Sequence, residues 1–285
     1  MKKQKLEKGT LYIVGTPIGN LSDITLRAIE TLKSVDIILA EDTRQTLKLL
    51  NHLKIEKHMI SYHRHNEAEK IEKVIALLDA GRNIALVSDA GMPIISDPGT
   101  KLIQILIQKE YNIDTIPGVT AITTAIVRSG LDSTRFTFEG FLSINKKQRK
   151  LRLESLKEEP RTMVFYEAPH KILATLKDLL AYLGNRKICI ARELTKIYEE
   201  YMYVDLENAI DKINESGIKG EIVLMVEGYK EDIDLAIYDN ICSAQLVKKE
   251  IEQGLNKKEA IKKVAKLKGV NKNEVYQECI EIEVE

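Results

Sequence analysis

The sequence predicts two α/β domains followed by a small helical extension. Short apolar strands alternate with amphipathic helices through the first half of the chain, which is typical of a mostly parallel sheet with helices on both faces. A second series of strands and helices starts at Arg135 and favours a mixed sheet. After Gly228 the sequence changes to an acidic linker and then to helices alone. We therefore place the three parts at 1–117, 118–230 and 236–285.

The composition limits the class of protein. The 285 residues are 44% hydrophobic and 30% charged, which excludes an intrinsically disordered chain. Because 43 basic residues balance 43 acidic ones, any contact with nucleic acid must come from local patches. Cys189, Cys242 and Cys279 form no CxxC pair, so neither disulfides nor a zinc site is predicted. The N-terminus lacks the apolar core of a signal peptide and no apolar run approaches the ~18 residues of a membrane span, so we expect a soluble, cytoplasmic protein.

Five apolar strands and the helices between them define the first part. Ser22 and Asp23 offer an N-cap and an acidic first turn to the first helix, and Gly81 is the expected C′ residue of the third. A further helix starts within 117–121, where small side chains leave backbone amides open to a ligand. The predicted strands are 11–15, 35–40, 59–62, 84–87 and a fifth that ends at 117. The predicted helices start at 22–23, end near 53, and span 66–80 and 100–109.

The loop within 85–99, read as ALVSDAGMPIISDPG, is the centre of the predicted site. Its two glycines permit positive φ, and its two prolines end any helix. A loop at the carboxyl end of a strand is where open α/β sheets bind ligands. The loop holds Asp89 and Asp97 but no Lys or Arg, so it favours ribose hydroxyls, an amino group or a positive centre over a phosphate. An ordinary strand-to-helix turn is the alternative.

Two other polar clusters follow strands of this part. Residues 41–44 form the charged cluster EDTR at the carboxyl end of the second strand. His63 and His65 have a spacing that could hold a metal on a strand, but no nearby third ligand completes such a site. A solvated or RNA-facing loop is therefore favoured there.

The second part carries a dense basic run between its first two strands. Strands are predicted at 136–141, 161–167, 187–191, 198–204 and 220–227, with helices that end near 183 and 216. The basic run is either a solvated helix face or a contact to RNA phosphates, because it lies beside the expected cleft. It consists of Lys146, Lys147, Arg149, Lys150 and Arg152.

The C-terminal part predicts two short helices. Asn256 and Asn271 each precede a Glu by three residues, which is typical of a capping box. Joined through Gly269, the helices resemble a helix-turn-helix, and a helical cap or dimerisation arm is the alternative. Nine Lys against three Glu within 240–273 favour nucleic acid slightly.

Seven segments, in this order and spacing, resemble one family. They are VGTPIGNLSDITLRA, LAEDTR, SDAGMPIISDPG, PGVTA, VFYEAPHK, ARELTK and KGEIVLMVEG. They are similar to the bacterial ribosomal RNA small-subunit methyltransferase I family of the tetrapyrrole-methylase superfamily. The resemblance covers 11–227, and the helical tail also resembles that family's extension. It implies an S-adenosylmethionine cleft between two α/β domains, a homodimer, and 2′-O-methylation of a cytidine in the decoding region of 16S rRNA, within the 30S subunit.

The resemblance also implies positions for the cofactor, and no metal. Precorrin methylases carry an aspartate where this chain has Met92, which argues against a tetrapyrrole substrate. A small-molecule tetrapyrrole methyltransferase and a non-catalytic nucleic-acid-binding protein remain the alternatives. The implied cofactor contacts are Pro17, Ile18, Met92, Ile95, Thr120, Ala121, Tyr166, Glu167, Gly220 and Glu221.

Methyl transfer to a ribose hydroxyl gives roles to residues that handle the hydroxyl proton and to residues that hold the RNA phosphates. The reaction is an in-line displacement, and a general base would activate the hydroxyl. Among the charged residues at strand ends, which include Glu41, we expect Asp89 or Glu193 to take or orient the proton. Each of them is otherwise a structural salt bridge or helix cap. The expected phosphate contacts are Arg44, Arg192, Lys196, Lys146, Lys147, Arg149 and Lys150.

Overall fold

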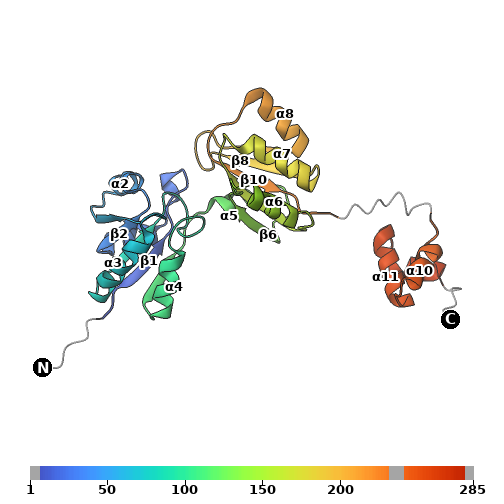
Figure 1. The fold of residues 1–285 in the computed structure, drawn as a ribbon, viewed down its shortest axis with the longest axis horizontal. Coiled ribbons are helices and arrows are strands. Elements are labelled where there is room, and N and C mark those ends of the chain that lie inside the picture. The colour runs from blue at the N-terminus through green and yellow to red at the C-terminus, as the bar shows by residue number, and fades with distance from the viewer. Residues whose placement is uncertain (1–6, 231–240, 280–285) are drawn as a thin grey trace. The chain divides into compact units, whose positions relative to one another are not determined.

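The structure is a computed structural model that describes residues 7–230 and 241–279 (Figure 1). The chain divides into two compact units, Met1–Tyr229 and Lys230–Glu285. The first unit contains two five-stranded sheets, and the second contains helices. The sequence therefore predicted the fold class correctly, while the division at 117 and 118 stays a prediction. The acidic linker and the start of the extension at 236 lie outside the described residues.

The first sheet is entirely parallel, with strand order β3-β2-β4-β1-β5. Separate hydrophobic cores cover its two faces because successive strand residues point to opposite sides. All four residues of β4 are buried, as expected of a central parallel strand. The strands are β1 (Thr10–Val14), β2 (Ile37–Ala40), β3 (His58–Ser61), β4 (Ile84–Val87) and β5 (Asn112–Ile116).

The helix that follows β4 packs on a different face of the sheet from the helices that follow the two neighbouring strands. The helices α1 (Leu26–Ser34) and α2 (Thr43–His52) pack on one face, whereas α3 (Glu67–Asp79) and α4 (Thr100–Gln108) pack on the other. The chain leaving β4 therefore turns to the face opposite to that used by its neighbours β1 and β2. Ligands of open α/β sheets bind at such switch points, at the carboxyl ends of the strands.

The second sheet is mixed, with strand order β6-β7-β10-β8-β9. Its β6 and β7 are parallel, and the other pairs are antiparallel. One face packs against the long helices, and the other packs against α5 (Ala121–Ile126). The strands are β6 (Phe136–Gly140), β7 (Thr162–Glu167), β8 (Lys187–Arg192), β9 (Glu200–Asp205) and β10 (Ile222–Val226). The long helices are α6 (Lys146–Ser155), α7 (Ile172–Leu183) and α8 (Leu206–Ser216).

The predicted start of the first helix is wrong. Thr25, not Ser22 or Asp23, is the N-cap of α1, because its hydroxyl accepts the Ala28 amide at 3.1 Å. Ser22 and Asp23 instead lie in a short 3-10 turn, η1 (Leu21–Asp23), which is capped by the side chain of Asn20.

In its described part, 241–279, the second unit has three helices, α10 (Ser243–Glu252), α11 (Lys257–Lys268) and α12 (Lys272–Glu278), around a small apolar core. The sequence predicted the last two. Asn256 caps α11 by accepting the Glu259 amide at 2.9 Å, and Gly269 ends that helix in the left-handed conformation. No helix of the described residues is long and apolar enough to cross a membrane.

Candidate active site

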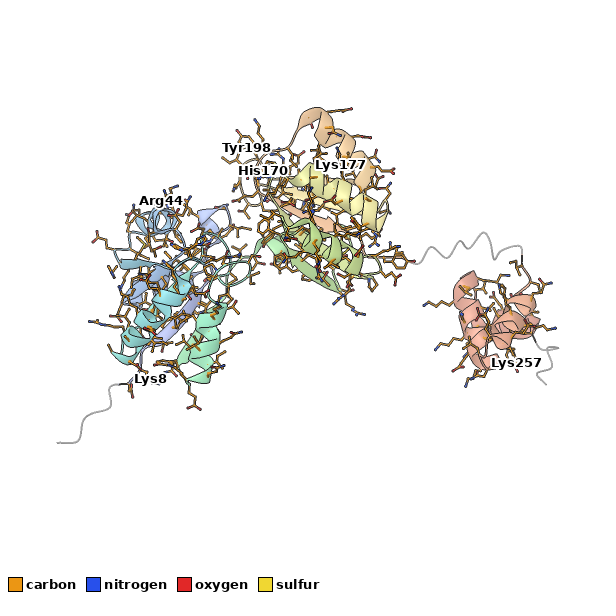
Figure 2. The ribbon with its side chains drawn as sticks, in the orientation of Figure 1. Lys8, Arg44, His170, Lys177, Tyr198 and Lys257 are labelled. Atoms are coloured by element: carbon orange, nitrogen blue, oxygen red, sulfur yellow. The ribbon has the colours of Figure 1, made fainter. Side chains whose placement is uncertain are left out.

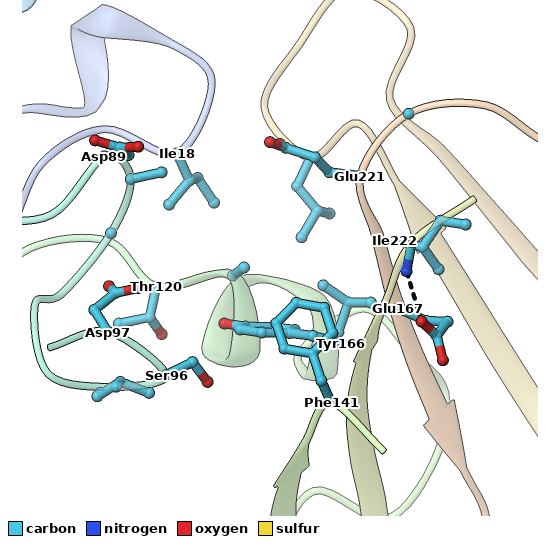
Figure 3. Close-up of a pocket in the computed structure, with 18 of the residues that line it drawn as sticks. Ile18, Asp89, Ser96, Asp97, Thr120, Phe141, Tyr166, Glu167, Glu221 and Ile222 are labelled. Carbon is cyan, nitrogen blue, oxygen red and sulfur yellow. Dashed lines mark hydrogen bonds between the residues drawn. The ribbon is translucent and has the colours of Figure 1, made fainter. Parts of the chain in front are cut away.

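A cavity of about 670 Å³ lies at the carboxyl end of β4 (Figure 3). One wall is formed by the loop after β4 and the end of β2, the other by β7 and the loops that precede β10 and follow β8. The start of α5 lies between them. This volume is within the range of small-molecule and cofactor sites.

The loop after β4 is held in a strained conformation. Ile94 and Ser96 have φ values of 77° and 73°, a region that residues other than glycine rarely enter, and a β-branched residue such as Ile94 least of all. The guanidinium of Arg64 donates to the Ser96 carbonyl, and Glu67 accepts the Gly99 amide at 3.0 Å. Strained backbone of this kind persists where surrounding contacts hold it, and it is frequent at functional sites.

Close backbone contacts join this loop to its neighbours. Thr16, after β1, exchanges two backbone hydrogen bonds of 2.9 and 3.0 Å with Gly91. A Cβ atom added to Gly15 would lie 2.8 Å from the Cα of Gly118, so neither position has room for a side chain. The segments after β1, β4 and β5 therefore meet at this end of the sheet.

Three carboxylates of the first sheet reach the cavity, and none of them has an ion pair among the described residues. Burial, followed by repulsion from Asp97 and Asp89, raises the pKa of Glu41 to about 7, and Arg64 opposes the shift. Burial likewise raises the pKa of Asp97. Asp89 is exposed and accepts the Asp42 amide at 3.0 Å.

The carboxylates of the second sheet are engaged instead. Glu193 accepts the Glu221 amide at 2.9 Å and a 3.1 Å bond from Lys196, which also pairs with the Glu221 carboxylate at 2.9 Å. The hydrogen bond from the Glu221 amide is the largest cause of the lowered pKa of Glu193. Gly220 has a φ of 90°, which strains any other residue, and a Cβ there would lie 2.5 Å from the Glu193 side chain, so glycine is favoured at this position.

Glu167 is 5% exposed and belongs to a network that ties β7 to α7. Its carboxylate accepts the Thr175 hydroxyl at 2.5 Å and the Ala168 amide at 2.8 Å. Arg149 donates to the same Thr175 hydroxyl at 2.9 Å and to Asp178 at 2.6 Å. The Glu167 carboxylate is therefore held by the protein itself.

An aromatic group completes the second wall. Tyr166 makes edge contacts with Phe138 and Phe141, with ring centroids 4.9 and 5.6 Å apart. Figure 3 shows its hydroxyl directed toward the side of the cavity where Thr120 and Asp97 lie. Burial is the main cause that raises its pKa to about 12, so the hydroxyl stays neutral and can donate. Aromatic rings that line a cavity, as Tyr166 and Phe141 do, can stack on a planar ring of a ligand.

The charge of the lining residues limits the charge of the ligand that the cavity can bind. Among the described residues that line the cavity there are six carboxylates but no Lys, Arg or His. The site therefore favours a neutral polar or a positively charged ligand over a phosphate.

Comparisons with known proteins agree with this architecture. The tetrapyrrole (corrin/porphyrin) methylase family matches residues 10–210. The ribosomal RNA small subunit methyltransferase I of Halalkalibacterium halodurans is 49% identical over 276 residues, which cover 96% of both chains. That of Bacillus subtilis is 46% identical, with 95% of this chain and 94% of the relative covered. The chain belongs to the ribosomal RNA small subunit methyltransferase I family.

A solved structure shows the same fold at low sequence identity. The uroporphyrin-III C-methyltransferase from Thermus thermophilus, complexed with S-adenyl homocysteine, has a TM-score of 0.56 and 18% identity. The alignment covers 77% of this chain and 97% of that one. It extends over most of the tetrapyrrole-methylase fold and leaves about a quarter of this chain outside.

The structure brings most of the predicted site residues together. Asp89 and Glu193, predicted as catalytic, both line the cavity, whereas Pro17 is buried and does not. The other predicted cofactor positions all line it: Ile18, Met92, Ile95, Thr120, Ala121, Tyr166, Glu167, Gly220 and Glu221.

The predicted RNA contacts lie outside the cavity lining. Lys146 and Lys147 are exposed on α6, and Lys150 forms only a loose 3.7 Å pair with Glu154. Arg44 lies in the first turn of α2 (Figure 2), where its side chain is 87% exposed and pairs with Asp42, the N-cap of that helix. Arg149 is held by its bonds within the protein, so a structural role is favoured over an RNA contact.

Two further predicted phosphate contacts are also paired. Arg192 binds Glu200 at 2.5 Å, and Lys196 binds the two carboxylates at the cavity.

Sequence reasoning did not choose Glu41, Asp97 or Phe141 for the site. Glu41 was recognisable as a carboxylate at a strand end. Its nearness to Asp97 depends on β2 and β4 being neighbours in the sheet, which no local pattern reveals.

Proposed function

We propose that this chain transfers a methyl group from S-adenosylmethionine to the 2′-hydroxyl of a cytidine in the decoding region of 16S rRNA. The observation that carries the proposal is the cavity at the switch point of the first sheet, whose described lining residues include six carboxylates and no cation. Relatives at 46–49% identity named as ribosomal RNA methyltransferases support RNA as the acceptor.

The residues present fit the cofactor. S-adenosylmethionine supplies a methyl group made electrophilic by the sulfonium that carries it. The Phe141 and Tyr166 rings offer a surface for adenine, and the carboxylates of the lining would attract the positive charges of the sulfonium and the amino group. The small residues Gly91 and Ala121 allow close approach of the ligand to the backbone.

RNA would be held outside the cavity by exposed cations. Lys146, Lys147 and Lys150 lie on one helix, α6, which begins five residues after Phe141 at the cavity. Lysines of this kind bind phosphates without reading sequence, so recognition of the decoding region would require the folded RNA. We therefore propose the 30S subunit as the substrate, acted on by a homodimer.

Methyl transfer to two forms of the RNA tests the proposal. The purified protein is incubated with methyl-labelled S-adenosylmethionine and either 30S subunits that lack the modification or protein-free 16S rRNA. We expect label in 30S subunits only, recovered as 2′-O-methylcytidine after digestion to nucleosides. Label on a base, or none on either RNA with cofactor binding intact, would refute the proposed reaction. Sedimentation velocity of the same sample tests the dimer.

A further inference from the structure

We propose that the carboxylate of Glu41, rather than that of Asp89 or Glu193, is the general base that accepts the proton of the ribose hydroxyl. This inference rests on the proposed function and names the catalytic residue of that same site. Three lines of evidence favour Glu41: its place in the cavity, its freedom from internal partners and the charges around it.

Glu41 follows the last residue of β2, next to β4 in the sheet, and its half-buried side chain lines the cavity. No hydrogen bond or ion pair of the described residues involves its carboxylate, so both oxygens are open to a substrate hydroxyl. The other candidates are less free. Glu193 already accepts the Glu221 amide and a Lys196 bond, while Asp89 is exposed and accepts the Asp42 amide.

The surroundings of Glu41 suit a base that works near neutral pH. Burial, with Asp97 and Asp89 beside it, raises its pKa to about 7, and Arg64 is the cation that opposes them. A general base is most effective when its pKa lies near the working pH. Bound cofactor adds positive charge, so we expect the pKa in the complex to lie below that of the free protein.

Methyl transfer and removal of the hydroxyl proton occur in one step. The ribose oxygen forms its new bond to the methyl carbon as its proton passes to a Glu41 oxygen. The bond between that carbon and sulfur breaks, and its electron pair stays on sulfur, which becomes a neutral thioether. Glu41 later releases the proton to solvent, and no oxidant or reductant is needed.

The test is a single-turnover rate as a function of pH, with cofactor and 30S subunits saturating. Glu41→Gln keeps the size of the side chain and removes the base, so we expect the rate to fall by roughly 10²–10⁴-fold. The wild-type rate should rise with pH until Glu41 is ionised, and this rise should vanish in Glu41→Gln. Calorimetric titration with S-adenosylmethionine and the thermal midpoint of unfolding check that the variant is folded and binds.

Three variants sharpen the result. Glu72→Gln, on the exposed face of α3, is the matched control and should behave as wild type. Glu193→Gln should keep the rise of rate with pH. Glu41→Asp keeps a carboxylate but withdraws it by one methylene, so it should be slower than wild type yet retain the rise; this variant also serves if Glu41→Gln does not fold.

The outcomes separate this inference from the proposed function. Active wild-type protein, with Glu41→Gln within tenfold of it and an unchanged pH profile, would overturn the role of Glu41 alone. If the rise of rate with pH were lost in Glu193→Gln and kept in Glu41→Gln, the role of Glu41 would also be overturned. A wild-type protein that does not methylate the cytidine hydroxyl would overturn both, because the base would have no such proton to accept.

Discussion

The two walls of the cavity both carry carboxylates, but the protein binds those of one wall more extensively than those of the other. The first-sheet wall presents Glu41, Asp89 and Asp97 with no ion pair among the described residues. The second-sheet wall presents Glu167, Glu193 and Glu221, whose carboxylates are bound by Thr175, by backbone amides and by Lys196. Residue type alone therefore does not distinguish the two walls, and the bonds that the side chains make do.

The difference has an energetic basis. Carboxylates that accept bonds from the folded protein are stabilised in their charged form, so they hold the second-sheet wall together. Glu41 and Asp97 are half-buried and lie near other carboxylates, which destabilises their charged form, so these two residues reduce the stability of the fold at neutral pH. Such local destabilisation is common where a protein keeps groups for binding or catalysis.

The largest effect on stability is expected when the pairing of the second-sheet wall is broken at Thr175. In Thr175→Val the buried Glu167 carboxylate loses its hydroxyl donor, and Arg149 loses an acceptor. Leaving such groups unsatisfied should reduce the free energy of unfolding by about 1–3 kcal/mol, measured by urea denaturation.

Thr175→Ser is the matched control, because it keeps the hydroxyl and loses only a methyl group. We expect it to recover most of the stability that Thr175→Val loses. Equal losses in both variants would show that packing of the methyl, rather than the bond to Glu167, stabilises this wall.

A smaller effect should appear in the pH dependence of unfolding. The pKa of Glu41 is about 7 in the folded protein against an ordinary 4.5, so the folded state binds the proton more tightly than the unfolded state. Stability should therefore fall as pH rises from about 4.5 to 7, and Glu41→Gln should remove this loss. Because the side chain is only half-buried, we expect the variant to gain about 1 kcal/mol at pH 8 and little at pH 4.

Glu193→Gln provides the opposite case. The lowered pKa of Glu193 means that its contribution is present above the ordinary value and lost as pH falls, so this variant should be less stable than wild type at pH 8. Urea unfolding at both pH values measures the two variants. A loss of stability in Glu41→Gln at pH 8 would contradict the contrast between the walls.

Local patterns were enough to predict most of the fold and much of the cavity. The buried strand β4, the glycine- and proline-rich loop after it, and the small residues that begin α5 follow from propensity and turn chemistry. The bound state of each carboxylate could not be predicted in that way. Glu193 and Glu221 are 28 residues apart, and only the folded backbone brings them and Lys196 together. The same holds for Glu41 and Asp97, whose repulsion requires β2 and β4 to be neighbours.

The same contrast between free and bound side chains exists among the cations of α6, and substituting a free one should have the smallest effect on stability. Lys147 is exposed and has no ion pair among the described residues, whereas Arg149 is bound to Asp178 and Thr175. Lys147→Ala should change the free energy of unfolding by less than about 0.5 kcal/mol, yet weaken binding to 30S subunits and lower the slope of log affinity against log salt by about 1. Arg149→Met should lower stability and leave that slope unchanged. The reverse pattern, measured by filter binding at several salt concentrations, would identify Arg149 as the phosphate contact and Lys147 as an ordinary surface lysine.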